Sequence, residues 1–305
     1  MRVLIVGLGS IAKKHMEALK KLDKNIQIFG LRHSKNSNRV EGVQNIYDIG
    51  DVEKYDFDFA IVANPTGEHL NTITQLKEFR IPLFIEKPLF SNIDDTSAEI
   101  VKSFEDLDIR TYVACNLRFL DCISYIKNEL LSELRINEVN VYCGSYLPDW
   151  RKDVDFRTIY SANKEMGGGV QLDLIHELDY VYWLFGIPNE TQAFFSNNSS
   201  LNITATDYAN YTWTYPSFSA NIILNYYRPT PKRQLEILTQ TDVWLVDLIE
   251  NKIYKNDALY FHSERNIQDT YTSQMLFFIE QILKNNKKFN SISEAFDVLT
   301  LCTSN

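Results

Sequence analysis

The chain has 305 residues, of which 45% are hydrophobic and 23% charged, and its formal net charge is −9. This length favours two domains at about 150 residues each. The negative charge, together with the absence of any long run of Lys or Arg, disfavours a nucleic-acid partner. No apolar stretch approaches the roughly 20 residues that a membrane-spanning helix needs.

The four cysteines (Cys115, Cys122, Cys143, Cys302) are scattered, without a C-x-x-C pair or nearby histidines. This pattern predicts reduced, mostly buried thiols, and neither a disulfide framework nor a metal site. The apolar run at residues 3–6 has no basic flank and no small-residue cleavage site, so it resembles a strand more than a signal peptide. We therefore expect a cytoplasmic protein with no membrane partner.

From residue 2 to about 115, short apolar runs alternate with amphipathic segments, as in βαβ units on a parallel sheet. We expect strands at 2–6, 26–31, 57–63, 83–85 and 111–115, and helices at 11–22, 68–78 and 94–104. The sequence thus predicts an α/β fold whose first domain, residues 1–118, has a Rossmann doubly wound parallel sheet.

After Arg118 the pattern changes. We expect a helix at 120–134, a strand at 137–146, an irregular stretch at 147–166 and a long helix at 170–185. Strands at 219–227, 234–238 and 243–249 follow, closed by helices at 267–283 and 292–301. Residues 119–305 are therefore predicted to form an α+β domain with a largely antiparallel open sheet.

The run from Gly7 to Ala12 (GLGSIA) follows a strand and opens a helix, which is the context that a dinucleotide fingerprint requires. Gly7 permits the tight turn, Gly9 lets the backbone approach a pyrophosphate, and Ala12 keeps the helix close to the sheet. The first N–H groups of the helix then face the phosphates. An incidental glycine turn is the alternative.

The second strand is followed by Arg32 and Ser34, where an acid that binds the ribose hydroxyls usually stands. A guanidinium pairs with phosphate in a bidentate way, so these residues favour NADP(H), with NAD(H) still open. A solvated basic loop is the alternative.

The motifs Glu86-Lys87-Pro88, Ala63-Asn64-Pro65-Thr66 and Gly167 to His176 (GGGVQLDLIH), in this order and spacing, resemble the glucose-fructose oxidoreductase / inositol dehydrogenase / rhizopine catabolism (Gfo/Idh/MocA) superfamily. The resemblance implies a Rossmann domain followed by a domain whose sheet often forms an oligomer interface, hence a homodimer or homotetramer. It maps the catalytic lysine to Lys87, before a cis proline at Pro88, and the remaining catalytic pair to Asp173 and His176. It maps cofactor contacts to Gly7, Gly9, Ser10, Ile11, Asn64, Thr66, His69 and Glu86.

The residues themselves fit this chemistry. Lys87 follows a buried strand at the end where open α/β sheets bind ligands. Asp173 and His176 are three apart on the expected helix, so they share a face, with Tyr180 one turn further on. A histidine suits acid/base work at neutral pH, and a lysine cation stabilises a developing alkoxide. Asp173 would orient the imidazole or bind another hydroxyl, and which of Lys87 and His176 takes the proton stays open.

The irregular stretch before the glycines carries Trp150, Arg151, Arg157 and Tyr160. Long irregular loops beside a site usually bind something, and arginines among aromatics suit an anionic sugar or nucleotide. We expect these residues, with Arg118 and Tyr180, to contact substrate. The alternative is that the arginines pair with Asp149, Asp153 and Asp155 and that the substrate is neutral.

The resemblance and these residues together predict an NAD(P)-dependent oxidoreductase of a sugar or sugar derivative, including the acidic or nucleotide-linked sugars of surface-polysaccharide metabolism. Two other functions stay open. One is redox-neutral glycoside hydrolysis with a retained cofactor, which net accumulation of reduced cofactor would exclude. The other is a dinucleotide-binding sensor without catalysis, against which the lysine, aspartate and histidine argue.

Overall fold

The computed structural model describes residues 1–34 and 39–304 and divides into two compact units. The first comprises Met1–Ala114 and Tyr271–Leu299, the second Cys115–Thr270 and Thr300–Asn305. The first segment ends near the expected boundary at residue 118, but the C-terminal helices return to the first unit. Phe278 explains the return, because its ring is buried among those of Phe59, Phe84 and Tyr112, at centroid distances of 5.0, 5.4 and 6.0 Å.

The sheet of the first unit has six parallel strands in the order β3-β2-β1-β4-β5-β6. This is the strand order of a Rossmann fold, so the predicted doubly wound sheet is confirmed. The strands are β1 (Arg2–Val6), β2 (Gln27–Leu31), β3 (Val43–Ile46), β4 (Phe59–Val62), β5 (Leu83–Glu86) and β6 (Thr111–Ala114). β4, β5 and β6 are buried along their whole length, as strands covered on both faces are.

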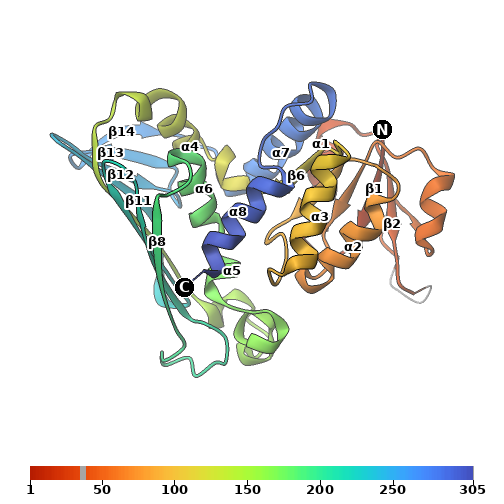
Figure 1. Ribbon diagram of the computed structural model, residues 1–305, viewed down its shortest axis with the longest axis horizontal. Coiled ribbons are helices and arrows are strands. Elements are labelled where there is room, and N and C mark those ends of the chain that lie inside the picture. The colour runs from red at the N-terminus through yellow and green to blue at the C-terminus, as the bar shows by residue number, and fades with distance from the viewer. Residues whose placement is uncertain (35–38, 305) are drawn as a thin grey trace. The chain divides into compact units, whose positions relative to one another are not determined.

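Three helices of the first unit follow the sequence pattern closely (Figure 1). They are α1 (Ser10–Leu22), α2 (His69–Lys77) and α3 (Asp95–Asp106). α1 buries one face made of Ala12, Met16 and Leu19, which recur at helical spacing. α3 begins with a capping box, in which the side chains of Asp94 and Ser97 each accept a hydrogen bond from the other residue's backbone N–H.

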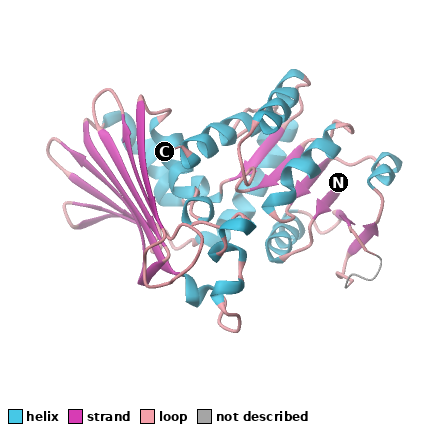
Figure 2. Cartoon of the chain, turned by 60° about the horizontal axis from the view of Figure 1, so that its bottom comes forward, coloured by secondary structure: helices cyan, strands magenta, loops and turns pink. Residues whose placement is uncertain are grey.

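The sheet of the second unit has eight strands in the order β14-β13-β12-β11-β7-β10-β9-β8. Only the β7–β10 pair is parallel, so the predicted largely antiparallel sheet is confirmed. Figure 2 shows these strands as a twisted fan. They are β7 (Ile136–Tyr146), β8 (Glu190–Ser196), β9 (Tyr208–Thr214), β10 (Ser219–Asn225), β11 (Tyr227–Thr239), β12 (Val243–Asp247), β13 (Lys252–Lys255) and β14 (Ala258–His262).

The helical segments of the second unit are more broken than the sequence pattern predicts. The expected helix at 120–134 is α4 (Asp121–Tyr125), continued by a π-helical turn at Ile126–Leu130 and a 3₁₀ turn at Leu131–Glu133. The expected helix at 170–185 is two helices, α5 (Val170–Asp173) and α6 (His176–Phe185).

The C-terminal helices are α7 (Ile267–Phe277), a π-helical segment at Phe278–Lys284 and α8 (Ile292–Thr303). None of the helices in the described part of the chain is long and apolar enough to span a membrane.

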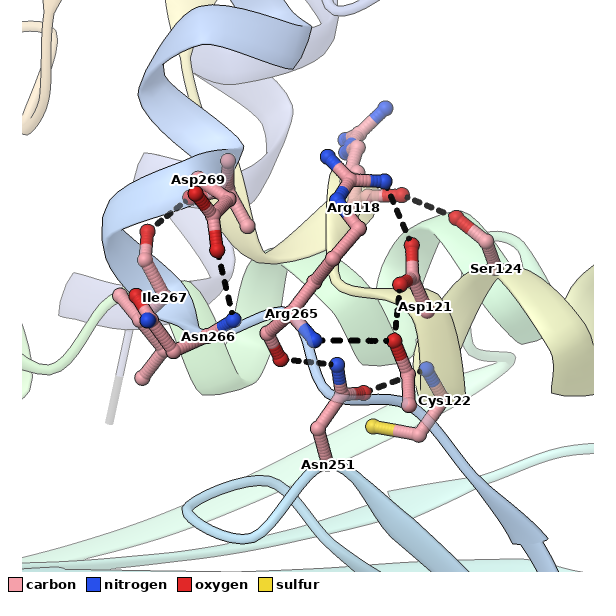
Figure 3. A network of polar contacts seen from close by, with 11 residues as sticks. Arg118, Asp121, Cys122, Ser124, Asn251, Arg265, Asn266, Ile267 and Asp269 are labelled. Atoms are coloured by element: carbon pink, nitrogen blue, oxygen red, sulfur yellow. Dashed lines mark hydrogen bonds and ion pairs between the residues drawn. The ribbon is translucent and has the colours of Figure 1, made fainter.

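A polar network fixes the start of α4 within the second unit (Figure 3). The side chain of Asn251 accepts a hydrogen bond from the backbone N–H of Cys122 at 2.9 Å and donates one to the carbonyl of Arg265 at 2.7 Å. The guanidinium of Arg265 in turn reaches Asp121 at 3.0 Å. Asn251 is buried, and these bonds satisfy polar groups that burial would otherwise leave unpaired.

Candidate functional site

The turn between β1 and α1 has room for a ligand in front of the helix. Gly7 has φ +86°, and a Cβ there would lie 2.4 Å from the backbone of Asn64, so only glycine fits. A Cβ on Gly9, the residue before α1, would meet nothing within 4 Å. The helix has no side-chain N-cap and no acid in its first turn. Its first N–H groups, with Ser10 and Ile11, are therefore suited to an anionic group such as a pyrophosphate.

The carboxyl ends of the parallel strands bring most of the predicted cofactor residues to one edge of the sheet. β1, β4 and β5 are neighbours, so Gly7 after β1, Asn64 after β4 and Glu86 at the end of β5 lie at the same edge. The Asn64 side chain donates to the Thr72 hydroxyl at 2.8 Å, and Thr66 begins the turn that leads into α2. Lys87 is half-buried directly after β5, and its peptide bond to Pro88 is cis, as the family resemblance predicted.

His69 lies between two backbone carbonyl groups. Its side chain is buried, with one ring nitrogen 3.1 Å from the carbonyl oxygen of Leu89 and the other 3.0 Å from that of Asn64. Burial lowers the pKa of His69, which favours a neutral ring that donates one of these bonds. With one N–H, His69 can donate to the carbonyl of Leu89 or to that of Asn64, so it ties one of these two loops in place, and its cofactor contact stays a prediction.

Glu86 has a buried partner that the sequence did not reveal. Its carboxylate contacts the ring of His15 on α1, and that ring packs edge-on against Phe84 at 4.9 Å. The contact ties the end of β5 to the helix that follows the glycine turn.

Arg32 and Ser34 follow β2 at the same edge of the sheet. The backbone N–H of Arg32 donates to the carbonyl of Ile46 at 2.9 Å, which extends the pairing with β3. Arg32 is half-buried and Ser34 is exposed. Their position beside the glycine turn agrees with a role at the adenosine end of a dinucleotide.

Asp173 and His176 flank the break between α5 and α6. The sequence placed them on one face of a continuous helix, but α5 ends at Asp173 and Leu174 leaves the helical region at φ −100°, ψ 27°. Asp173 is buried, whereas His176 is half-buried at the first position of α6. The carboxylate of Asp173 is thus held at the end of α5, whereas the imidazole of His176 is held at the start of α6.

Two tyrosines hold the Asp173 carboxylate. The hydroxyl of Tyr160 donates to one oxygen at 2.6 Å, and the hydroxyl of Tyr226 donates to the other at 2.5 Å. Burial, and then the charge of Asp173, raise the pKa of both tyrosines, so both hydroxyls keep their protons at neutral pH. The positive charge of Arg151 lowers the pKa of Tyr160, but this effect is smaller.

The irregular segment 147–166 presents aromatic and cationic side chains at the surface of the second unit. Trp150 is 39% exposed, its indole N–H donates to Ser145 at 3.0 Å, and its ring lies edge-on to Tyr226 at 5.4 Å. Arg151 is exposed. Arg157 stacks over Phe156 at 4.4 Å and lies 3.9 Å from the carboxylate of Asp155, a distance too long for a hydrogen bond.

Arg118 and Tyr180 have buried side chains. The Arg118 guanidinium has no exposed surface and donates two hydrogen bonds, of 2.9 and 2.7 Å, to the carboxylate of Asp179. Tyr180 is fully buried on the inner side of α6. Both side chains are buried in the second unit, and the substrate contacts expected of them stay predictions.

Sequence reasoning missed Tyr226, and it missed the buried ion pair between Glu177 and Arg233, whose closest atoms are 2.6 Å apart. Tyr226 stands at the end of an apolar strand pattern, 53 residues from Asp173. No local pattern marks such a partner. The ion pair anchors the first turn of α6, next to His176.

Two family models match the chain. A model of the oxidoreductase family with an NAD-binding Rossmann fold matches residues 1–114, and a model of the GFO/IDH/MocA C-terminal domain matches residues 128–242. Together they span well over half of the chain.

Among curated proteins, the rhizopine catabolism protein MocA of Rhizobium meliloti is 20% identical over 193 residues, which cover 61% of this chain and 57% of that protein. The 2,7-anhydro-N-acetylneuraminate hydratase of Escherichia coli (strain K12) is 26% identical over 141 residues, covering 46% of this chain and 37% of that protein. The chain thus matches about half, or less, of the length of these relatives.

Among solved structures, the WlbA dehydrogenase from Bordetella pertussis, in complex with NADH and UDP-GlcNAcA, superposes with a TM-score of 0.79. It is 16% identical, and the match covers 99% of this chain and 94% of that one. At this identity the likeness shows a shared fold.

Proposed function

Because the chain belongs to the GFO/IDH/MocA oxidoreductase family, with its NAD-binding Rossmann domain, we propose that it is a dehydrogenase or reductase that moves a hydride between a nicotinamide and a sugar hydroxyl carbon. The observation that carries this proposal is the β1–α1 turn. There an uncapped helix N-terminus faces open space at Gly9, beside Lys87 at the same sheet edge. The reaction would take place in the cytoplasm, where buried thiols stay reduced.

A nicotinamide held at the β1–α1 turn would supply the acceptor for the hydride of the substrate's carbinol carbon. The hydroxyl proton goes to His176 or to Lys87, since both groups suit the transfer. Where His176 takes the proton, the Lys87 ammonium stabilises the alkoxide that forms. Asp173 keeps its place through hydrogen bonds from its two tyrosine partners.

We propose further that the substrate is an acidic or nucleotide-linked sugar. Arg151 and Arg157 are exposed, Arg151 lies close enough to Tyr160 to affect its pKa, and Arg157 is only loosely paired. A guanidinium on such a segment can bind a carboxylate or phosphate bidentately. The bound UDP-GlcNAcA of the Bordetella dehydrogenase agrees with this chemistry.

A screen tests both proposals. Neutral sugars, sugar acids and nucleotide sugars are each incubated with NAD⁺ and with NADP⁺, and formation of reduced cofactor is followed. We expect turnover with an anionic substrate, and a higher KM in Arg151→Ala and Arg157→Ala but not in the control Arg135→Ala, which changes an exposed arginine at the start of β7. If a neutral sugar were the best substrate and both variants kept their KM, the proposal of an anionic substrate would be wrong.

The name of the Escherichia coli relative, a hydratase, favours one second candidate, a reaction with no net redox change. In that case the substrate would be converted while no reduced cofactor accumulates. Product analysis of the same screen separates the two. A protein that binds dinucleotide but converts no substrate would instead be a sensor.

We also propose that the outer face of the second sheet forms a homo-oligomer interface. On β7 and β10 the side chains of Tyr142 and Ile223, which point away from the core, are half-exposed. Sedimentation velocity is expected to give a dimer or tetramer, and Ile223→Lys should dissociate it, because a charge would be buried at the interface. The control Ile187→Lys, in an exposed turn, should not. A monomeric wild type would refute this proposal.

A further inference from the structure

We propose that Tyr226 is a positioning residue of this site: it shares the carboxylate of Asp173 with Tyr160 and thereby fixes Tyr160 and the irregular segment 147–166. The expected effect on turnover rests on the proposed function. The expected effect on the order of the segment does not.

The carboxylate of Asp173 is a bridge between two hydroxyls. Each oxygen accepts one of them, at 2.6 Å from Tyr160 and 2.5 Å from Tyr226. Such short O–H···O⁻ bonds are among the stronger hydrogen bonds in proteins. Removing either hydroxyl takes away one of these two short bonds to the buried carboxylate, so the other bond is less firmly directed.

The two ends of the bridge differ in rigidity. Tyr226 is fully buried between β10 and β11, its backbone N–H donates to the carbonyl of Asp207 at 3.0 Å, and its own carbonyl accepts from Leu147 at 2.8 Å. Tyr160 is 43% exposed and begins the short 3₁₀ turn Tyr160–Ala162. Tyr226 is therefore the fixed end, and Tyr160 is the end that needs support.

The order of the segment 147–166 depends on Tyr160 because Gly168, in the glycine run that follows the segment, packs directly against the Tyr160 backbone. A Cβ on Gly168 would lie 2.0 Å from the carbonyl oxygen of Tyr160, so this close approach needs glycine. The amide of Asn163 donates to that same carbonyl at 2.9 Å, and the amide of Gly168 donates to the carbonyl of Asn163 at 2.9 Å. These amides therefore report whether the segment is ordered around Tyr160.

Hydrogen exchange of the protein without ligand tests the proposal. In Tyr226→Phe the amides of Asn163 and Gly168 are expected to exchange about tenfold faster, the factor that corresponds to about 1.4 kcal/mol, near the lower end for a hydrogen bond to a charged group. The matched control is Tyr211→Phe, since Tyr211 is equally buried in the same sheet but donates to a backbone carbonyl, that of Cys302, at 2.8 Å. Tyr211→Phe should leave these amides as in wild type.

Tyr160→Phe removes the other end of the bridge at a half-exposed residue, so it tests the proposal even where Tyr226→Phe does not fold. It should accelerate the same two amides. Unchanged exchange in both variants, or equal acceleration in Tyr211→Phe, would overturn the positioning role.

On a substrate found by the screen, Tyr226→Phe should raise KM several-fold, because the segment that Tyr226 fixes binds the substrate. If exchange rises but wild type oxidises no sugar, the proposed function fails and the positioning role stands. If wild type is active and Tyr226→Phe changes neither exchange nor KM, the positioning role fails alone.

Discussion

At the scale of single residues, the choice of cofactor depends on Arg32. It follows β2 at the sheet edge shared with the glycine turn, where a carboxylate would repel a 2′-phosphate. We predict that NADP(H) binds more tightly than NAD(H), and that Arg32→Ala weakens NADP(H) binding by about tenfold or more, since it removes charge-assisted bonds. Titration of both cofactors into both proteins measures this, with NAD(H) as the internal control. Equal wild-type affinities would contradict the assignment.

Lys87 and His176 are predicted to act on the rate of the chemical step. General acid/base catalysis contributes typically 10²–10⁴-fold, so Lys87→Ala and His176→Ala should each lower kcat by at least roughly 100-fold, with little change in cofactor affinity. Lys102→Ala, at an exposed lysine on α3, is the control for loss of a positive charge. Near-normal turnover in either variant would remove that residue from the mechanism.

At the scale of elements, alanine substitutions of the two glycines in the β1–α1 turn are predicted to have different effects, one on stability and the other on cofactor binding. Gly7→Ala places a Cβ 2.4 Å from the Asn64 backbone at φ +86°, so it should cost at least about 1–3 kcal/mol of stability. Gly9→Ala points its methyl group into open space, so it should leave stability within about 0.5 kcal/mol but obstruct the phosphates.

Thermal unfolding without cofactor, followed by cofactor titration, separates the two effects. Gly7→Ala should unfold at a lower temperature than wild type, and Gly9→Ala should keep the wild-type Tm and lose affinity. A Gly9→Ala variant that bound the dinucleotide normally would show that the pyrophosphate does not lie at this turn.

Elements with strong local patterns were predictable and those defined by distant partners were not. β4 and β5 are continuous apolar runs, and α1 has a clear buried stripe, so each could be recognised alone. β3 has one buried residue in four, and β13 has only Ile253 buried, which leaves too little alternation to detect. β9 does alternate, with Ala209, Tyr211 and Trp213 buried, and that signal was available but overlooked.

The candidate site shows the same division. Gly7, Gly9 and Lys87 were predictable because a turn and a strand end fix them locally. The break at Leu174 was not, since neither Gly nor Pro marks it. The buried ion pair of Arg118 was not predictable either, because its partner Asp179 lies 61 residues away.

At the scale of the whole molecule, the return of residues 271–299 to the first unit makes that unit discontinuous in sequence. The rings of Phe278, Phe59 and Phe84 account for the return, and their contact exists only in the fold. The order of strands and helices along the chain therefore predicts two sheets, but it does not predict which of the two sheets the C-terminal helices pack against.

The central claim is hydride transfer to a nicotinamide, and isotope transfer tests it most directly. The panel of sugars is supplied with deuterium at the oxidisable carbinol carbons, and the cofactor is recovered and analysed by mass spectrometry. We expect deuterium in the reduced cofactor from wild type, for at least one anionic sugar, and at least roughly 100-fold slower labelling with Lys87→Ala. Binding of the dinucleotide with no label transferred from any sugar would contradict it.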